Sequence, residues 1–546
     1  MPGKASTVAP LSAILVAFAL WAAWGWSPHD FGYLHDDSLY MSAGRSIAQG
    51  EGYRFPSLPV DVSRAKYPVG YPLLLSLVWT IEPDFPDVLG WAFALHILIG
   101  WCFLSAAYVL FRQLEWGKRG ALALTAVCAF HPGLMDVTRS ALSDLPFMAL
   151  ALGSAIAVER ALRNGESHVW TSKWWALATA LAVAAVMTRS IGVAVIAGIF
   201  LVAAWRRALR PALVYAAIGA IVFVAAWASK GAVLSTDGGY PGFAQTLLFY
   251  TDYVGFWRFA VPDWTTFGEQ LEFNGMQLLK APAYLCFFLP LLGFSAGGML
   301  QASGIALSVG IVRGAFRGAR SVTIHPVAGA FILYLPIVLL WNFSLAGRFL
   351  LLFVPFLYHG AAQEIGSLLQ PAREAFRKSG ERSQRVAAVI LCTLIVGLIG
   401  YAAHRCLWRI PQGSRAFAWE RAALNEEKES AYQWIRENTD AGDHLVAYED
   451  VVLYFRTGRQ ALRPIAPSTA SFYLQDLEVL QPDIDRLGDT ARATHARYWL
   501  VSEDDYHLEH ADTYLREATA ELLLEAPVVF ESPGGLVKLH DLIEAP

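Results

Sequence analysis

The residues best suited to chemistry lie in one polar stretch, residues 35–72. It opens with the carboxylate pair Asp36 and Asp37 and closes with Lys66 and Tyr67 in a turn rich in proline and glycine. The segments on both sides are apolar enough to span a bilayer, and ionisable groups beside hydrocarbon are functional by default. The stretch therefore predicts a candidate general base and a candidate phosphate clamp within one loop.

Membrane helices must position these residues. Of the 546 residues, 55% are hydrophobic and 16% are charged, whereas soluble proteins carry about 25% charged residues. A helix needs about 20 residues to cross the hydrocarbon. The composition predicts an α-helical polytopic membrane protein with about eleven transmembrane helices. The candidate spans are residues 11–27, 89–111, 120–138, 141–159, 173–188, 190–205, 211–229, 282–312, 325–343, 347–366 and 386–405.

The distribution of charge predicts the orientation of these spans. Every second connection is basic, namely residues 112–119, 160–163, 206–210, 313–320 and 373–385. Basic loops stay in the cytoplasm, which places the N-terminus there as well. The first span ends in bulky tryptophans, a poor cleavage site, so we interpret it as an uncleaved anchor rather than a signal peptide. The outer loops 28–88 and 231–281 and the C-terminal part are then extracytoplasmic.

Further charged residues are predicted to converge on the same outer face: Arg139, Asp144, Arg189 and Arg348. Structural alternatives exist for most of them. Arg139 and Arg348 could be interfacial arginines that snorkel to the membrane surface. Asp144 could cap the helix that follows it. One of Asp36 and Asp37 could likewise only cap a helix and oppose its dipole, so we expect one structural and one chemical acid.

The order of several short motifs resembles GT-C glycosyltransferases, above all the protein-mannosyltransferase and aminoarabinose-transferase type. The likeness covers most of the chain, and the order of the motifs is more specific than any one of them. The matching motifs are Asp36-Asp37-Ser38-Leu39-Tyr40, a short helix ending at Gln49-Gly50, Lys66-Tyr67-Pro68, Ser143-Asp144-Leu145-Pro146, Thr188-Arg189-Ser190, Gly347-Arg348-Phe349, and Tyr432-Gln433-Trp434 in the C-terminal part.

Enzymes of this family take a sugar from a polyprenyl-phosphate carrier and pass it to an acceptor on the outer face of the membrane. The resemblance implies that Asp36 is the catalytic carboxylate and that Lys66 binds the carrier phosphate. The pair here is Asp-Asp where Asp-Glu is common, which leaves the role of Asp37 open. Asp144 is a further candidate catalytic acid. The other candidate phosphate ligands are Tyr67, Arg189 and Arg348.

The chemistry suits these residue types independently of the resemblance. Breaking the bond between a sugar and a lipid phosphate passes through an oxocarbenium-like state. The charge left on the phosphate suits lysine and arginine, and a carboxylate can take the proton of the attacking hydroxyl. Attack from the side opposite the phosphate would invert the anomeric carbon. A nucleotide-sugar donor is disfavoured because no glycine-rich nucleotide fingerprint follows a strand.

The chain divides into a membrane part, residues 1–406, and a C-terminal part, residues 407–546. The C-terminal part is predicted to be a small α/β domain that binds the acceptor or only covers the membrane part. Its pattern indicates a helix at 418–439, strands at 444–448 and 497–501, and a hairpin at 528–539. The aromatic residues of loop 231–281 could line the path of a polyprenyl tail or form a passive interfacial belt.

Metal and nucleic-acid partners are not predicted. His507, Glu509 and His510, together with Asp504 and Asp505, could ligate a metal, but a solvated helix start is the simpler interpretation. Some distant GT-C members use a divalent cation at paired acids, yet nothing here demands one, so we predict no cofactor. A basic patch with interleaved aromatic residues, the usual footprint of nucleic-acid binding, is missing from the sequence.

The predicted function is sugar transfer in a plasma membrane, from a polyprenyl-phosphate donor to a lipid, glycan or protein acceptor. Membrane lipids are the other expected partners. Three alternatives remain open. A transporter or flippase would carry ionisable residues in mid-span and related halves. A ligase of whole lipid-linked glycans would share most of this architecture, and a binding protein would carry a dead site.

Overall fold

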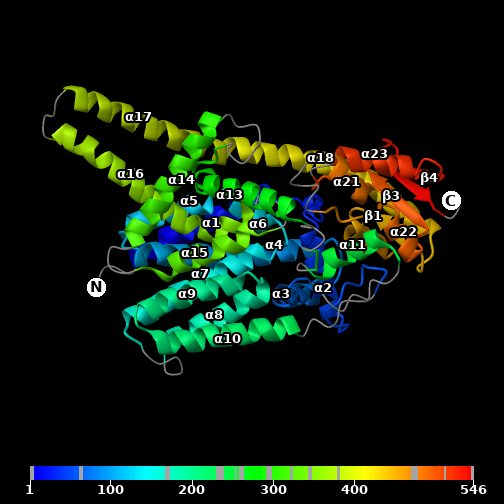
Figure 1. Cartoon of the computed structure of the whole chain (residues 1–546), viewed down its shortest axis with the longest axis horizontal. Coiled ribbons are helices and arrows are strands. Elements are labelled where there is room, and N and C mark those ends of the chain that lie inside the picture. The colour runs from blue at the N-terminus through cyan, green and yellow to red at the C-terminus, as the bar shows by residue number, and fades with distance from the viewer. Residues whose placement is uncertain are drawn as a thin grey trace.

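A bundle of long helices occupies one end of the molecule and a smaller domain with a β-sheet occupies the other (Figure 1). The N-terminus lies at the end of the bundle away from the sheet, and the C-terminus lies beside the sheet. The structure is a computed structural model that describes residues 5–60, 66–166, 172–228, 239–252, 255–256, 263–289, 298–319, 324–341, 347–377, 382–468, 477–509 and 512–542.

The bundle consists of apolar helices that carry the predicted spans. Six helical runs in the described residues have the length and hydropathy of a membrane span, and α5 with α6, bent by 56°, makes a seventh. The shorter apolar helices α1, α8, α9 and α15 fall on the remaining predicted spans. The bounds are α1 (Ala5–Trp24), α4 (Val88–Gln113), α5 (Lys118–Ala129), α6 (Pro132–Arg139), α7 (Asp144–Arg163), α8 (Lys173–Thr188), α9 (Gly192–Trp205), α10 (Leu209–Ala228), α13 (Trp264–Phe287), α14 (Gly298–Ala319), α15 (Pro326–Leu339), η2 (Arg348–Phe353), α16 (Val354–Arg377) and α17 (Arg382–His404).

Two predicted boundaries around α13 are wrong. The predicted span 282–312 joins the end of α13 to most of α14, and the predicted outer loop 231–281 contains most of α13. This helix packs against α14, α15 and α16, so it belongs to the bundle. Its polar residues lower its hydropathy below that of a typical membrane span. Gln270 and Asn274 donate hydrogen bonds to the carbonyl oxygens of Leu339, Leu340 and Trp341, at and just beyond the C-terminal end of α15.

Close helix contacts in the bundle depend on glycine. A Cβ on Gly198 of α9 would lie 2.2 Å from the carbonyl oxygen of Gly329 in α15. One on Gly314 of α14 would lie 2.3 Å from the carbonyl oxygen of Gly360 in α16. Small residues at such crossings let helix backbones approach closely, which is the usual way that helices pack in membranes.

The first outer loop folds into η1 (Pro28–Asp30), α2 (Asp36–Ala48) and α3 (Gly70–Ile81). The short helix predicted to end at residues 49–50 is therefore confirmed. Leu39 and Met41 of α2 and Leu75 and Trp79 of α3 lie in one apolar cluster, which also contains Phe455 of the C-terminal domain. The loop is thus packed between the bundle and that domain.

The C-terminal domain has a five-stranded mixed sheet in the order β2-β1-β3-β5-β4. Strand β1 pairs in parallel with β2 and β3, and β5 pairs antiparallel with β3 and β4. The predicted strands and hairpin are present, and β2 was not predicted. The bounds are α18 (Ile410–Asn438), β1 (Leu445–Ala447), α19 (Asp450–Thr457), β2 (Ala461–Leu462), α21 (Leu477–Ile484), α22 (Asp489–Thr494), β3 (Tyr498–Ser502), α23 (Asp512–Leu522), β4 (Val528–Glu531) and β5 (Val537–Asp541).

One continuous helical run joins the bundle to this domain. It extends over 57 residues, Arg382–Asn438, and contains α17, the π-helical turn η3 (Arg405–Arg409) and α18. Figure 1 shows the run leaving the bundle along one side and ending beside the sheet. The boundary at residue 407 falls inside it.

Candidate functional site

Asp36 lies at the centre of the predicted site, at the first position of α2. Its Oδ1 accepts a hydrogen bond of 2.5 Å from the Tyr67 hydroxyl, and its Oδ2 accepts one of 3.2 Å from an NH2 group of Arg348. The Asp36 and Arg348 side chains are 21% and 24% exposed. The structure therefore brings three of the predicted residues together in a partly open site.

Asp144 and the two predicted arginines continue the cluster. Asp144 Oδ2 lies 2.6 Å from Arg189 NH1, and its Oδ1 lies 3.6 Å from Arg348 Nε. Asp144 begins α7, but it is not the residue that caps it, because the N-cap position is Ser143. Its carboxylate instead holds two guanidinium groups side by side, both over the ring of Phe349.

A glycine sets the position of Arg348. Gly347 has a φ of 74°, and a Cβ there would lie 3.1 Å from Cε1 of Tyr284 in α13. Both the backbone conformation and the close approach favour glycine. The chain can therefore turn sharply into η2 and direct Arg348 toward Asp36 and Asp144. Arg348 does not snorkel to the membrane surface.

Arg139 does not join the cluster in the way that its position in the sequence predicted. Its Nε and NH2 groups donate hydrogen bonds of 3.1 Å to the carbonyl oxygens of Ala22 and Trp21, at the end of α1. A cation at the C-terminal end of a helix satisfies unpaired carbonyls and complements the helix dipole. Arg139 therefore caps the C-terminal end of α1.

Lys66 is buried beside the same carboxylate. Its Nζ lies 3.7 Å from the centroid of the Phe249 ring and 4.9 Å from that of Tyr67. Burial lowers the pKa of Lys66 to about 7, although the nearby Asp36 carboxylate opposes that shift. An anionic ligand that binds beside a buried lysine stabilises the charged form of that lysine.

The two acids of the pair have different surroundings. Asp37 is buried, and its carboxylate accepts backbone N–H groups from Gly32 at 3.1 Å and Ser38 at 2.9 Å. Burial raises the pKa of Asp37 to about 7. For Asp36, burial alone would raise the pKa, but Lys66, Arg348 and the Tyr67 hydroxyl lower it to about 2. Asp37 thus holds the loop backbone, while Asp36 faces the cations.

A contact directly beside Asp36, made by His35, Tyr250 and Asp450, could not be predicted from the sequence. His35 Nε2 lies 3.1 Å from Asp450 Oδ1, and the Tyr250 hydroxyl donates a hydrogen bond of 2.7 Å to Asp450 Oδ2. Tyr250 comes from α11 (Pro241–Thr251), and Asp450 begins α19 in the C-terminal domain. These residues lie 200 and more positions apart along the chain, so no local spacing could have revealed the contact.

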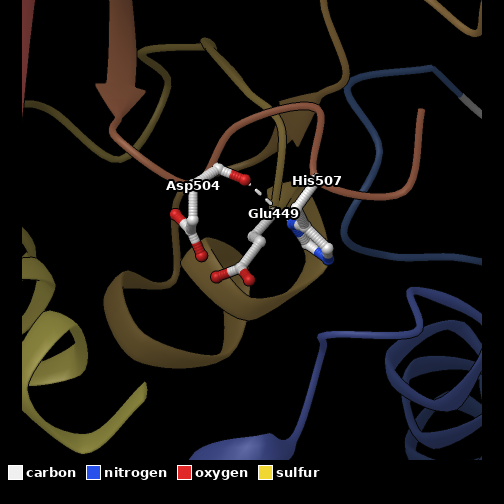
Figure 2. A group of neighbouring side chains, drawn as sticks. All are labelled: Glu449, Asp504 and His507. Atoms are coloured by element: carbon white, nitrogen blue, oxygen red, sulfur yellow. Dashed lines mark hydrogen bonds between the residues drawn. The ribbon is translucent and has the colours of Figure 1, made fainter. Parts of the chain in front are cut away.

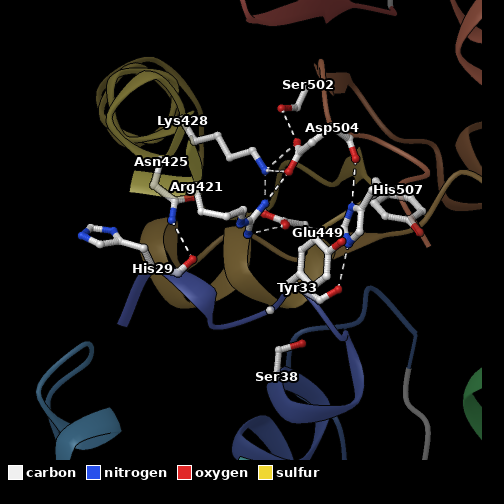
Figure 3. A network of polar contacts seen from close by, with 12 residues as sticks. His29, Tyr33, Ser38, Arg421, Asn425, Lys428, Glu449, Ser502, Asp504 and His507 are labelled. Atoms are coloured by element: carbon white, nitrogen blue, oxygen red, sulfur yellow. Dashed lines mark hydrogen bonds and ion pairs between the residues drawn. The ribbon is translucent and has the colours of Figure 1, made fainter. Parts of the chain in front are cut away.

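A second cluster of charges lies where the C-terminal domain meets the first outer loop. Glu449, Asp504 and His507 have ligand atoms within 4.8 Å of one another, a spacing that could hold a metal ion (Figure 2). Lys428 Nζ lies 2.8 Å from a Glu449 oxygen and 2.9 Å from an Asp504 oxygen. Arg421 pairs with both carboxylates as well (Figure 3).

Both ring nitrogens of His507 already contact backbone carbonyl oxygens of the protein. Its Nδ1 lies 2.9 Å from the carbonyl oxygen of Asp504 and its Nε2 lies 2.8 Å from that of Tyr33, on whose ring it stacks. Two cations and two carbonyl oxygens thus take up the groups that a metal would need. The predicted helix start here is wrong, because α23 begins at Asp512. His510 lies outside the described residues.

The chain resembles two membrane enzymes of known structure over nearly its whole length. One is the archaeal oligosaccharyltransferase AglB from Archaeoglobus fulgidus, in complex with an inhibitory peptide and a dolichol-phosphate: 14% identity, 98% of this chain and 75% of that chain, TM-score 0.54. The other is ArnT from Cupriavidus metallidurans bound to undecaprenyl phosphate: 13% identity, 98% of each chain, TM-score 0.52. The fold is that of the GT-C glycosyltransferases. No family model and no curated protein matches the sequence.

Proposed function

We propose that this protein is a glycosyltransferase that moves a sugar from a polyprenyl-phosphate donor to an acceptor hydroxyl at the outer face of a plasma membrane. The observation that carries the proposal is the partly open cluster in which Asp36 contacts Tyr67 and Arg348 beside the buried Lys66. A carboxylate and cations at one opening match the two demands of this reaction, a base and a phosphate ligand. The GT-C fold supports the same reaction, since the ArnT structure holds undecaprenyl phosphate.

In this mechanism the donor phosphate binds to Lys66, Arg348 and the Tyr67 hydroxyl. Charge-assisted hydrogen bonds from these groups stabilise the negative charge that grows on the phosphate as its bond to the sugar breaks. Asp144 acts as a positioning residue, because it lies between Arg189 and Arg348 and is only 6% exposed. The ion pair with Arg189 holds the Asp144 carboxylate in place.

Asp36 is the proposed base. With a pKa of about 2, the Asp36 carboxylate is too weakly basic to take a proton from a hydroxyl efficiently. A bound phosphate competes for Lys66 and Arg348 and adds negative charge, and both changes raise the pKa of Asp36. The base is therefore strengthened only when the donor is present. Attack from the side opposite the phosphate inverts the anomeric carbon.

The topology that we propose puts the N-terminus in the cytoplasm and residues 407–546 outside. The N-terminus, the end of α16 and the start of α17 lie at the end of the bundle opposite the sheet (Figure 1). The sequence that joins these two helices lies within the basic stretch 373–385, and basic connections stay in the cytoplasm. Residues 1–406 then carry the reaction, and the site opens toward the outer surface.

Transfer of a whole lipid-linked glycan is the second candidate. The likeness to AglB, an oligosaccharyltransferase, is as high as that to ArnT in TM-score. However, this chain covers 98% of ArnT and 75% of AglB, which favours the shorter enzyme as a guide. Analysis of the product separates the two, because it shows either one added sugar or a complete glycan.

The experiment that tests the proposal is sugar transfer in proteoliposomes with radiolabelled polyprenyl-phosphate sugars and total membrane acceptors. Wild type is compared with Asp36→Asn and Lys66→Ala, and with Glu51→Gln as an exposed acid just beyond α2. We expect transfer by wild type and Glu51→Gln and a loss of at least about 100-fold in the other two variants. No transfer by wild type from any donor would overturn the proposal in favour of transport or binding.

A further inference from the structure

The residue before Asp36 adopts a strained backbone conformation. His35 has φ 58° and ψ −45°, and the N–H of Asp36 lies 2.6 Å from the carbonyl oxygen of Leu34. This is a γ-turn of the positive-φ type, which is rare and strained for a residue with a side chain. The carbonyl of His35 accepts the first hydrogen bond of α2, from Leu39. The turn therefore sets the direction in which α2 starts and Asp36 points.

The side chain of His35 provides the anchor for this turn. It is 3% exposed, and its Nε2 lies 3.1 Å from Asp450 Oδ1, which is itself fully buried. Because a carboxylate only accepts hydrogen bonds, Nε2 carries the proton and donates it. The other Asp450 oxygen accepts the hydroxyl of Tyr250 at 2.7 Å. Asp450 is thus held from two sides, and a buried, charge-assisted pair of this kind is geometrically strict.

The same anchor reaches Lys66. The N–H of Lys66 donates a hydrogen bond of 3.1 Å to the carbonyl oxygen of Tyr250. The ring of Phe249, the neighbour of Tyr250, contacts both groups: its centroid lies 3.7 Å from Lys66 Nζ, and it stacks on the His35 ring at 5.7 Å between centroids. Asp450 therefore contacts one residue next to Asp36 and one residue that holds Lys66.

The C-terminal domain also holds the helix that carries Tyr250. Gly242 N–H in α11 donates to Asp489 Oδ2 at 2.8 Å, and Gln245 Nε2 donates to the carbonyl oxygen of Ala466 at 2.7 Å. A Cβ on Gly242 would lie 2.7 Å from Arg486 Cβ, so α11 packs too closely against Arg486 to admit a side chain at this position. This close contact makes α11 and the sheet domain one unit at the site.

We infer that Asp450 is a positioning residue that sets Asp36 and Lys66 for transfer through His35 and Tyr250, so that the C-terminal domain forms part of the reaction centre. The inference rests on the proposed role of Asp36. It departs from the two roles expected of this domain, acceptor binding or cover, because a residue of the domain acts on the geometry of the base. A displacement of about 1 Å at a reacting group can cost about 100-fold in rate.

The test compares transfer rates of Asp450→Asn, His35→Ala and the double variant with wild type in proteoliposomes. Glutamine can present an N–H at nearly the reach of His35 Nε2, so His35→Gln is the rescue variant. Asp512→Asn is the matched control, since Asp512 also begins a helix of this domain and pairs with an arginine, Arg516, at its surface. Folding and insertion of each variant are checked by thermal unfolding in detergent.

We expect Asp450→Asn and His35→Ala each to lower kcat by about 10- to 100-fold, with a much smaller change in KM for the donor. The double variant should be no slower than the slower single one, because both changes remove one interaction. His35→Gln should recover most of the rate, and Asp512→Asn should match wild type.

Two results would overturn this inference and leave the proposed function intact, provided that Asp36→Asn is inactive in the same preparation. The first is a wild-type kcat in Asp450→Asn. The second is a loss in the double variant equal to the product of the two single losses. If Asp450→Asn fails to fold, equal kcat values for His35→Ala and His35→Gln would overturn it in the same way. A wild-type protein that transfers no sugar would instead remove the proposed function, and this inference with it.

Discussion

Two clusters of acids and bases differ in how completely they are closed. Around Glu449 and Asp504, each carboxylate meets both Arg421 and Lys428, and the four side chains are 7%, 18%, 4% and 3% exposed. Around Asp36, the contacting arginine and the carboxylate remain 24% and 21% exposed. The first cluster uses its charges to hold α18 against the rest of the C-terminal domain. The second leaves charge accessible to a ligand.

Backbone strain is found beside both clusters. His35, directly before Asp36, and Tyr506, directly before His507, both have positive φ. Strain at a residue persists only when its surroundings hold it. Open charge, rather than strain, therefore distinguishes Asp36 from the larger ion network and favours it as the proposed place of chemistry.

The largest expected effect of a single change on stability lies in the closed cluster. Lys428→Met would leave the buried Glu449 with Arg421 as its remaining cation, and removing one partner of a buried ion pair costs about 3–5 kcal/mol. We expect a clearly lower unfolding midpoint in detergent, and a kcat near that of wild type for the protein that remains folded. An unchanged midpoint would show that this network does not hold the domain.

The largest effect on rate should come from the open cluster. Arg348→Ala removes a preorganised donor to the phosphate, and such donors contribute about 10²–10³ in kcat. Because Arg348 is partly exposed, the unfolding midpoint should change much less than in Lys428→Met. The measurement is kcat and midpoint together, with Arg516→Ala as the control, since Arg516 pairs with Asp512 at the surface. If Arg348→Ala were unstable but normally active, the open cluster would serve stability rather than the reaction, which would contradict its proposed role.

A smaller effect is expected from pH. Burial lowers the pKa of Lys66 to about 7, and only its protonated form attracts a phosphate. Donor affinity should therefore fall as pH rises through about 7, by at most about tenfold per unit. In Lys66→Arg the cation stays charged, so the dependence should flatten. Binding isotherms between pH 6 and 9 check this, and a flat wild-type profile would contradict it.

Much of the site could be predicted from sequence because topology alone brings it together. Charged residues at the outer ends of successive spans must lie at one surface, which is why Asp144, Arg189 and Arg348 could be placed beside Asp36. The break before Pro132 also has a local cause, since proline favours the first position of a helix and interrupts a longer one. These features depend on local patterns that a sequence displays directly.

The rest depends on contacts that no local pattern encodes. The pairing of His35 with Asp450 joins residues 415 positions apart, in two different domains. Helix α13 is hard to recognise because Gln270 and Asn274 satisfy the carbonyls of a neighbouring helix, which makes a buried helix look polar. Asp36 and Asp37 could not be told apart because adjacent residues in one motif differ only in what the folded chain places beside each.

The decisive measurement is the single-turnover rate of sugar transfer from prebound donor in Asp36→Asn and Asp37→Asn, each beside wild type. We predict that Asp36→Asn binds the donor but transfers at least about 100-fold more slowly. Asp37→Asn, which keeps an acceptor for one backbone N–H, should lose far less. A normal rate in Asp36→Asn with a large loss in Asp37→Asn would contradict the assignment of Asp36 as the base.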